Sequence, residues 1–433
     1  MNGSPFRWTG PLASLDAVAR SALCERGSAR DTLVRATTAA ILERVAREGD
    51  LALLALAREL DGVELRSLEV PRERWRAALR SLDPALCAAL ERAATNLASV
   101  HGAFRPMAQE CSPEPGIRVG RRPDPLDRVG VYAPGGRASY PSSVLMALVP
   151  ARIAGVREVI VCSPPGPGGD PAPAVLAAAE LAGADRLFAI GGAGAIAAMA
   201  YGTTTIPRVD RIVGPGNAYV CEAKAQVAGR VSIDCPAGPS EVLVVADPGA
   251  DPDAVARELI AQAEHDPEAS AVAVAIGEPG ARRIVTAALR TLAETPSRAT
   301  AARALGARGA VLWTDALSGA LAFAADYAPE HLMLAVEDPE GALAGVRHAG
   351  TVFLGLASSV AFGDYMTGAN HVLPTGGLAR SYSGLSPLDF VRWTSWQSVT
   401  REAAGSLAGP VGVLADAEGL PAHAAAARGW RAS

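Results

Sequence analysis

From about Val129 onward, short runs of apolar and β-branched residues alternate with alanine-rich stretches. The runs VGVYA (129–133), REVIVCSP (157–164) and RLFAIG (186–191) are separated by helical patterns such as PAPAVLAAAELAG (171–183). Runs this short and this continuously apolar are typical of strands buried on both faces of a parallel sheet. The stretches between them suit right-handed helical crossovers. The pattern therefore predicts an α/β fold built on a parallel sheet.

The alternation restarts at EVLVVAD (241–247) and continues through SAVAVAIG (270–277), GAVLWTD (309–315) and TVFLG (351–355). Two successive series predict two doubly wound, Rossmann-like parallel-sheet domains with small helical extensions at both ends of the chain. The weakly patterned stretch 295–309 is expected to be an exposed connection. The predicted division is an N-terminal helical extension (1–31), a first α/β domain (32–131 with 241–384), a second, Rossmann-like domain (132–240) and a C-terminal helical extension (385–433).

The composition excludes several classes of function. A net charge of −5, an isoelectric point of about 5.8 and only 5% aromatic residues argue against a nucleic-acid binder. Apolar runs are broken by charges, glycine or proline well before the ~20 residues of a membrane span. The N-terminal MNGSPFRWTG lacks the apolar core of a signal peptide, and the six cysteines form no CxxC pair. We therefore expect a cytoplasmic protein without nucleic-acid or membrane partners.

Two glycine-rich turns could bind a ligand. The segment 192–197 follows a predicted strand and fits G-x-G-x-x-A, but the nearby acidic residue, Asp210, precedes the next strand instead of ending it. Ordinary close packing of a helix on a strand explains this segment equally well. In VGPGNAYV (213–220), Asn217 begins a predicted helix, whose free N–H groups favour a phosphate. A simple helix cap is the alternative role for Asn217.

Two segments place a histidine beside a second polar side chain. In AQAEHDP, Gln262 and His265 lie three residues apart at the end of a predicted helix, where they could bind a metal ion or simply be solvated. In APEHL, Glu330 and His331 directly precede a strand. An imidazole titrates near pH 6.5, so His331 is a natural proton carrier, although a purely structural role is equally open.

Two further segments hold a carboxylate and a histidine. GDYMTGANHVLPTGG contains Asp364 and His371 among glycines, and ADAEGLPAH contains Glu418 and His423 around a predicted helix start. None of these pairs has a recognised metal-site spacing. Only convergence in three dimensions would make them one site.

Taken together, these segments resemble the histidinol dehydrogenase family. The resemblance covers about residues 129 to 423, with the motifs in the family's order and spacing. It implies a homodimeric, NAD-linked enzyme with one zinc ion per subunit, which oxidises L-histidinol to L-histidine through L-histidinaldehyde with two NAD+. The segments that carry it are RVGVYAPGGRASYPSSVLMALVPARIAGV, GGAGAIAAMAYGTTTIPRVDRIVGPGNAYV, AGPSEVLVVAD, AQAEHDP, APEHL, GTVFLG, GDYMTGANHVLPT and AEGLPAH.

The resemblance also implies roles for individual residues. Residues 132–240 would bind NAD, residues 241–384 would carry the catalytic loop and most metal ligands, and the C-terminal extension would complete the partner subunit's site. The implied zinc ligands are Gln262, His265, Asp364 and, from the partner, His423; the implied acid–base pair is Glu330 and His331. The implied substrate-binding positions are Ser240, His371 and Glu418, the last from the partner, together with Gln262, His265, His331, Asp364 and His423; the implied NAD contacts are Tyr132, Gly194 and Asn217.

One position departs from the family pattern. The family usually has GGAQA where this chain has GGAGA, so Gly194 replaces a glutamine that would contact NAD. Because glycine cannot donate that side-chain hydrogen bond, we expect the NAD site to be weaker or shifted. On this reasoning alone, Gly194→Gln should lower the KM for NAD+. Pro421, where the family often has a capping threonine, is a smaller change.

Three alternatives remain open at this point. A related enzyme of the same fold could oxidise another primary alcohol, such as a sulfonated diol. A homologue without activity could serve as a binding or regulatory protein. A cysteine thiohemiacetal could carry the aldehyde step through Cys162, Cys221 or Cys235, but buried structural thiols are the better interpretation of these residues.

Overall fold

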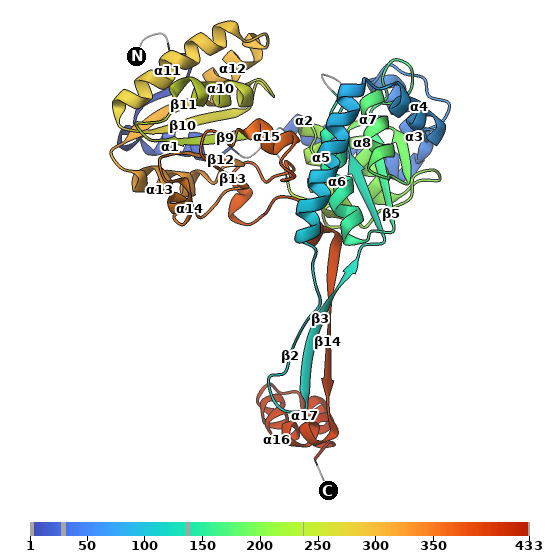
Figure 1. The fold of residues 1–433 in the computed structure, drawn as a ribbon. Helices are drawn as coiled ribbons and strands as arrows, with labels where there is room; N and C mark the ends of the chain where they lie inside the picture. Colours follow the sequence, from blue (N-terminus) through green and yellow to red (C-terminus); the bar gives the residue numbers. More distant parts are fainter. Residues whose placement is uncertain (1–3, 27–31, 136–138, 237, 432–433) are drawn as a thin grey trace.

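The computed structural model consists of two α/β lobes, with an arm that projects from one of them (Figure 1). It describes residues 4–26, 32–135, 139–236 and 238–431. Each lobe is built on its own parallel sheet, and the arm is a separate three-stranded antiparallel sheet that ends in two helices. The predicted fold class is therefore confirmed. None of the described helices is long and apolar enough to cross a membrane.

The first lobe is a six-stranded parallel sheet with the order β1-β11-β10-β9-β12-β13. In strand β9, near the middle of the sheet, Val242 and Val244 face one layer of helices, while Leu243 and Val245 face the other. Helices α10, α11 and α12 cover the first face, and α1, α13 and α14 cover the second. The strands are β1 (Trp8–Pro11), β9 (Glu241–Ala246), β10 (Ser270–Ile276), β11 (Ala310–Thr314), β12 (His331–Ala335) and β13 (Thr351–Leu354), and the helices are α1 (Ala17–Cys24), α10 (Pro252–Ala263), α11 (Glu278–Glu294), α12 (Arg298–Arg308), α13 (Leu317–Tyr327) and α14 (Pro339–Leu343).

The second lobe is a five-stranded parallel sheet with the order β6-β5-β4-β7-β8. Val129 and Val131 face a layer that contains α5, α6 and α7, while Tyr132 and Ile160 face a layer that contains α2, α3, α8 and α9. The strands are β4 (Arg128–Tyr132), β5 (Glu158–Ser163), β6 (Arg186–Ala189), β7 (Arg211–Val213) and β8 (Ser232–Ile233), and the helices are α2 (Thr32–Glu48), α3 (Asp50–Leu60), α4 (Arg72–Ser81), α5 (Pro84–Ala103), α6 (Pro141–Ala154), α7 (Pro173–Leu181), α8 (Gly192–Tyr201) and α9 (Ala218–Val227).

The structure differs from the predicted division of the chain. The helices of residues 32–103 pack against the five-stranded sheet, with α2 on α8 and α9, α4 on α7, and α5 on α6. They do not belong with residues 241–384, so this part of the predicted division is wrong. The boundary expected at 131/132 falls inside strand β4. An apolar stripe on a helix specifies that one face is buried, but not which sheet buries it.

The two ends of the chain also differ from the predicted helical extensions. Residues 8–11 form β1, which pairs in parallel with β11 from Trp8↔Ala310 onward. The C-terminal part begins with β14 (Val391–Val399), which pairs antiparallel with β3 (Ile117–Pro125) to build the arm, and β2 (Gln109–Cys111) completes this sheet. The stretch expected as an exposed connection contains α12, whose Ala301, Ala304 and Leu305 are buried. The remaining elements are α15 (Val360–Tyr365), α16 (Arg401–Ala417), α17 (Pro421–Arg428) and the short 3-10 helices Leu12–Ser14, Leu378–Arg380 and Pro387–Phe390.

Candidate active site

Glu330 and His331 lie at the amino end of β12, at the end of the six-stranded sheet where this strand begins. Helix α13 ends at Tyr327, the three residues 328–330 follow, and His331 begins the strand. Both side chains are only 4% exposed. Strand β12 pairs in parallel with β9, so His331 lies opposite Val242, next to Glu241. The pair is therefore held at the start of two neighbouring central strands.

The backbone of one residue, Glu241, binds both members of this pair. Its N–H donates a hydrogen bond of 2.7 Å to Glu330 Oε2, and its carbonyl oxygen lies 2.8 Å from His331 Nδ1. Because a carbonyl can only accept, His331 carries a proton on Nδ1. The other ring nitrogen, Nε2, is buried without a hydrogen-bond partner and lies 3.5 Å from Asp364 Oδ1. The predicted acid–base pair thus has a defined geometry.

Burial and neighbouring charges shift the pKa values of this pair. Burial raises the pKa of Glu330 to about 8, because the charged carboxylate loses its hydration. Burial alone would lower the pKa of His331, but the Glu330 and Asp364 carboxylates outweigh it and raise that pKa to about 9. The two groups lie 3.5 Å apart and titrate as a coupled pair. In the chain alone, both groups therefore exchange protons at mildly alkaline pH.

Asp364 and His371 lie beside this pair, on α15 and on the segment that follows it. His371 Nδ1 is 2.8 Å from the Asp364 carbonyl oxygen, and its Nε2 is 3.1 Å from the hydroxyl of the buried Ser143 on α6. His371 Nδ1 therefore carries the proton, and Nε2 accepts from Ser143. Burial lowers the pKa of His371, whereas the adjacent His331 imidazole holds the pKa of Asp364 low despite its burial. A substrate that binds His371 Nε2 would displace the Ser143 hydroxyl.

Helix α10 ends at Ala263, so Gln262 lies in its last turn, while His265 lies in the turn beyond it and not on the helix as predicted. Gln262 is 3% exposed and its amide nitrogen has no hydrogen-bond partner, whereas His265 is exposed. Asp364, the third implied ligand from this chain, lies 3.5 Å from His331. Oxygen and nitrogen donors of this kind suit zinc. Among the described residues of the single chain, however, no three histidine, cysteine, aspartate or glutamate side chains form a metal-binding group.

The remaining predicted site residues divide between the sheet edge and the arm. Ser240 directly precedes β9 and is partly exposed. Glu418 and His423 are exposed on the arm, where Glu418 ends α16 and His423 lies in α17. Figure 1 shows α17 at the far end of the arm, away from both lobes. The chain does not bring these two residues to its own Glu330 and His331.

The predicted cofactor residues lie at the carboxyl end of the strands of the five-stranded sheet, whereas the acid–base pair lies at the amino end of a strand of the six-stranded sheet. The chain builds β4, β5 and β6 in one direction and then places β7 on the other side of β4. Ligands of open α/β sheets bind at such a switch point. Tyr132 ends β4, and Gly214 follows β7; a Cβ on Gly214 would lie 2.2 Å from the Tyr132 carbonyl oxygen. Only glycine, here at φ +114°, allows this approach.

The side chains of Tyr132 and Asn217, at this end of the sheet, form structural hydrogen bonds. The Tyr132 hydroxyl accepts a hydrogen bond of 3.1 Å from the Gly192 N–H, and burial raises its pKa to about 12. Asn217 Oδ1 caps α9 by accepting from the N–H groups of Tyr219 and Val220. A cavity of about 570 Å³ opens beyond β4 and β5, lined by Pro134, Gly135, Ser139, Ser163 and Pro164 among others.

The structure argues against the expectation for Gly194. Gly194 lies in the first turn of α8 and is buried. A Cβ at this position would lie 3.2 Å from Leu56 Cδ1 and 3.6 Å from Leu53 Cδ2, both on α3. A longer side chain would therefore enter apolar packing. An increase in NAD affinity from Gly194→Gln does not follow from this geometry.

Comparison with known proteins agrees with the site. The sequence profile of the family described as "Histidinol dehydrogenase" matches residues 24–430. The chain belongs to the histidinol dehydrogenase family. A histidinol dehydrogenase of Halobacterium salinarum is 48% identical over 415 residues (96% of this chain, 97% of the relative), and one of Methanosarcina barkeri is 44% identical over 407 residues (94% of each). A crystal structure of histidinol dehydrogenase from Elizabethkingia anophelis superposes with a TM-score of 0.94 at 33% identity, over 99% of each chain.

These findings confirm the predicted family and activity: the chain is an NAD-dependent oxidoreductase that acts on an alcohol and an aldehyde. Sequence reasoning missed four buried polar residues around the site. Glu241 could have been noticed as a charge that begins an otherwise apolar strand, and Lys224 as the only lysine of the chain. Arg26 and Ser143 carry no such signal, because each acts through a partner more than 200 residues away.

Proposed function

We propose that this chain oxidises L-histidinol to L-histidine through L-histidinaldehyde, with Glu330 and His331 as the acid–base pair. The observation that carries the proposal is the shared attachment of both side chains to the Glu241 backbone, which leaves His331 Nε2 without a hydrogen-bond partner, 3.5 Å from Asp364 Oδ1. A buried imidazole nitrogen that lacks a hydrogen bond is costly unless a substrate or ligand group uses it.

In the first step, His331 Nε2 takes the hydroxyl proton of histidinol while the carbinol hydrogen leaves as hydride to NAD+, which gives the aldehyde and NADH. Water then adds to the aldehyde carbon, and Glu330 orients this water and takes its proton. His331 releases the proton of the first step to solvent and, in the second hydride transfer, accepts the proton of the hydrate hydroxyl; the product is a carboxylate with a second NADH. Burial of both residues keeps the reactive aldehyde away from bulk water.

Gln262, His265 and Asp364 would hold a zinc ion together with His423 of the partner subunit. The Gln262 amide, whose nitrogen has no hydrogen-bond partner, and the anionic Asp364 fit this role. The three side chains of one chain form an incomplete set of ligands, which the partner's residue would complete. When bound, zinc would hold the nitrogen donors of the substrate and would offset the Asp364 charge that raises the pKa of His331. Every proton transfer is assigned to the side chains of the protein.

The arm supports a homodimer as part of this proposal. Val413 and Leu414 on α16 and Trp430, which follows α17, are each more than half exposed (64%, 66% and 54%). Apolar side chains exposed together on one projecting element mark an interaction surface. If a second copy covers this surface, Glu418 and His423 can reach the partner's site, where His371 and Ser240 would also contact the substrate. We place the reaction in the cytoplasm, a compartment compatible with six free cysteines.

The thiol alternative has little support from the site. Cys162 and Cys235 are buried, and burial raises the pKa of Cys162 strongly and that of Cys235 to about 12. Burial also raises the pKa of Cys221, whose Sγ lies 3.3 Å from the Gly216 carbonyl oxygen. A thiol nucleophile needs a thiolate near neutral pH. The aldehyde step is therefore assigned to water and Glu330.

The test measures NADH formation from histidinol and from histidinaldehyde in purified protein, with and without a chelator. His331→Asn should lower kcat for both substrates, and Glu330→Gln should lower it more for the aldehyde, by roughly 10²- to 10⁴-fold for a lost acid or base. Both variants should keep zinc content and thermal unfolding unchanged. Loss of zinc in either variant, equal loss of both half-reactions in Glu330→Gln, or faster oxidation of a sulfonated diol than of histidinol would contradict the proposal.

A further inference from the structure

A buried ion pair lies directly behind Glu330 and His331, and the proposed reaction does not use it. Arg26 and Glu241 are each 2% exposed, and two hydrogen bonds join them, Nε–Oε1 at 2.9 Å and Nη2–Oε2 at 2.8 Å. Arg26 lies just beyond α1, 215 residues before its partner. Apolar side chains of similar size often replace a buried ion pair without loss of stability. The pair is therefore better explained by a role in the site than by stability alone.

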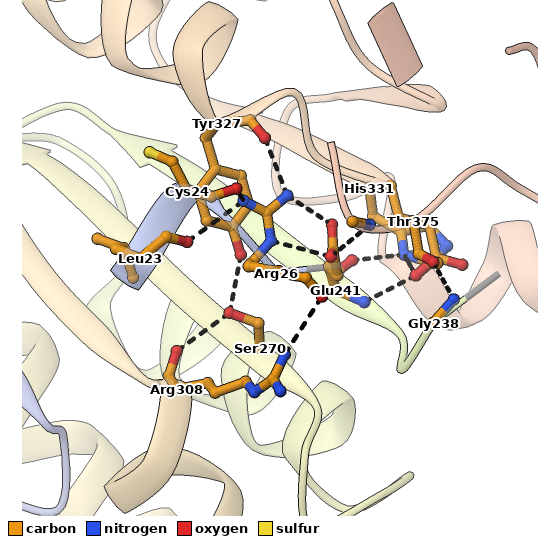
Figure 2. A network of polar contacts seen from close by, with 12 residues as sticks. Leu23, Cys24, Arg26, Gly238, Glu241, Ser270, Arg308, Tyr327, His331 and Thr375 are labelled. Carbon is orange, nitrogen blue, oxygen red and sulfur yellow. Dashed lines mark hydrogen bonds and ion pairs between the residues drawn. The ribbon is translucent and has the colours of Figure 1, made fainter. Parts of the chain in front are cut away.

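Glu241 connects this ion pair to the reacting groups. The same residue whose carboxylate binds Arg26 holds Glu330 with its backbone N–H and His331 with its backbone carbonyl. Figure 2 shows Glu241 between Arg26 on one side and His331 on the other. A shift of the Glu241 backbone would therefore move both acid–base residues together.

Arg26 also binds the segment that leads from α13 into the acid–base pair. Its Nη2 donates a 2.9 Å hydrogen bond to the carbonyl oxygen of Tyr327, and its guanidinium lies 3.4 Å from the centroid of the Tyr327 ring. Tyr327 ends α13 and is followed by Ala328, which alone among the described non-glycine residues has a positive φ, at 49°. This backbone conformation is rarely adopted by a residue with a Cβ. The guanidinium thus fixes the strained link that leads into Glu330.

The carboxylate of Glu241 has a second partner on the segment that carries His371. Glu241 Oε1 accepts a 2.7 Å hydrogen bond from the Gly376 N–H, and the neighbouring Thr375 hydroxyl accepts one from the Gly238 N–H. Both contacts tie residues 371–376 to the chain just before β9 (Figure 2). The carboxylate of Glu241 therefore contacts the Arg26 guanidinium and the Gly376 N–H, while its backbone holds Glu330 and His331.

We propose that Arg26 and Glu241 are positioning residues for the acid–base pair, an inference that rests on the roles proposed above for Glu330 and His331. The guanidinium fixes the Glu241 carboxylate and the Tyr327 carbonyl at the same time. The Glu241 peptide then holds His331 with its proton on Nδ1, so that Nε2 faces the substrate and can accept a proton. Lysine cannot replace this arginine, because an ammonium group lacks the planar fork that binds two acceptors in fixed directions.

The test compares Arg26→Lys with Arg20→Lys. Arg20 is a matched control, since it lies on α1 and pairs with Asp326, directly before Tyr327, but this ion pair is exposed. We expect Arg26→Lys to lower kcat by about 10- to 100-fold, the loss that a small misplacement of reacting groups produces. The KM values for histidinol and NAD+ should stay within about threefold, and zinc content should not change. Arg20→Lys should leave all of these unchanged.

A second variant separates positioning from stability. Arg26→Met combined with Glu241→Met removes both charges and fills their space, so the protein should fold with a thermal midpoint near that of the parent chain. Its kcat should still fall at least tenfold, because methionine binds neither the Tyr327 carbonyl nor the Gly376 N–H. Arg26→Lys that fails to fold would leave this double variant as the deciding measurement.

Three results would overturn the inference. The first is a kcat of Arg26→Lys equal to that of Arg20→Lys, and the second is a folded double methionine variant with full kcat. The third is a loss of kcat that follows the loss of zinc or of folded protein. If His331→Asn and Glu330→Gln also keep their kcat, the proposed function fails; if only those two lose it, the positioning role alone fails.

Discussion

Replacement of Lys224 should destabilise the five-stranded lobe and weaken NAD+ binding together. Lys224 is 1% exposed, forms an ion pair with Asp234, and donates a 3.0 Å hydrogen bond to the Gly214 carbonyl oxygen. Asp234 in turn accepts a 2.8 Å hydrogen bond from the Gly214 N–H. The pair therefore holds both backbone polar groups of the glycine that touches Tyr132 at the switch point.

The magnitude follows from what Lys224→Met leaves behind. Asp234, whose side chain is 5% exposed, would lose its counter-ion, and the Gly214 carbonyl would lose its donor. Removing one partner of a buried ion pair costs about 3–5 kcal/mol. For a lobe of about 200 residues, each kcal/mol lowers the thermal midpoint by about 2–4 °C, so we expect a decrease of about 6–20 °C. The KM for NAD+ should rise, while the KM for histidinol should change less.

The assay is a double-mutant cycle with Asp234→Asn. Thermal unfolding and the KM for NAD+ are measured for the parent, both single variants and the double variant at one protein concentration. Because the neutral amide that Asp234→Asn introduces needs no counter-ion, the double variant should be more stable than the sum of the single losses implies, by at least about 1 kcal/mol. Additive losses, or a Lys224→Met protein with an unchanged thermal midpoint, would refute the reasoning.

Two further variants test buried positions away from the reacting groups. Gly194→Gln should lower the thermal midpoint and leave the KM for NAD+ unchanged or higher, because the new side chain meets Leu56 and overpacking costs about 1–3 kcal/mol; a lower KM would contradict this. His101 is 3% exposed with both ring nitrogens unpaired, and burial lowers its pKa. The unfolded chain therefore binds a proton that the folded chain resists, and stability falls as the pH drops below about 6.5. In urea unfolding between pH 7 and 5, His101→Phe should lose less stability than the parent chain; equal losses would show that His101 does not contribute.

The strands of both sheets were predictable from sequence because their apolar runs are continuous, as burial on two faces requires. Strand β1 was not, since WTGP has no strand pattern and forms only where the edge of β11 offers hydrogen-bond partners. Helices α2 and α3 were expected, but their assignment to the first lobe was wrong. Leu42 and Leu53 lie in the apolar stripes of these helices, and the sequence does not show which lobe buries them. In the structure, both side chains pack into the core of the five-stranded lobe.

The candidate site shows the same limit at the level of single contacts. Glu330 and His331 could be singled out because a carboxylate and an imidazole stand together before a strand. Residue types alone do not show whether two adjacent side chains share one function, because the shared contact is made by the backbone. Glu241, about ninety positions earlier, offers its N–H to one side chain and its carbonyl to the other. Hydrogen bonds to a peptide leave no trace in residue types, so no sequence pattern could reveal them.

The arrangement of the two sheets explains why the chain needs so many buried polar contacts near its site. The proposed cofactor edge is the carboxyl end of one sheet, whereas the acid–base pair lies at the amino end of the other. The chain passes from β8 to β9 in only the seven residues 234–240, and residues 366–377 bind both lobes through Ser143 and Glu241. Hydride transfer requires reacting atoms held within about 3.5 Å, and neither lobe alone holds both reactants. The short connection therefore joins the two edges directly, and a buried ion pair anchors each of its ends within its own lobe, Lys224–Asp234 in the five-stranded lobe and Arg26–Glu241 in the six-stranded lobe.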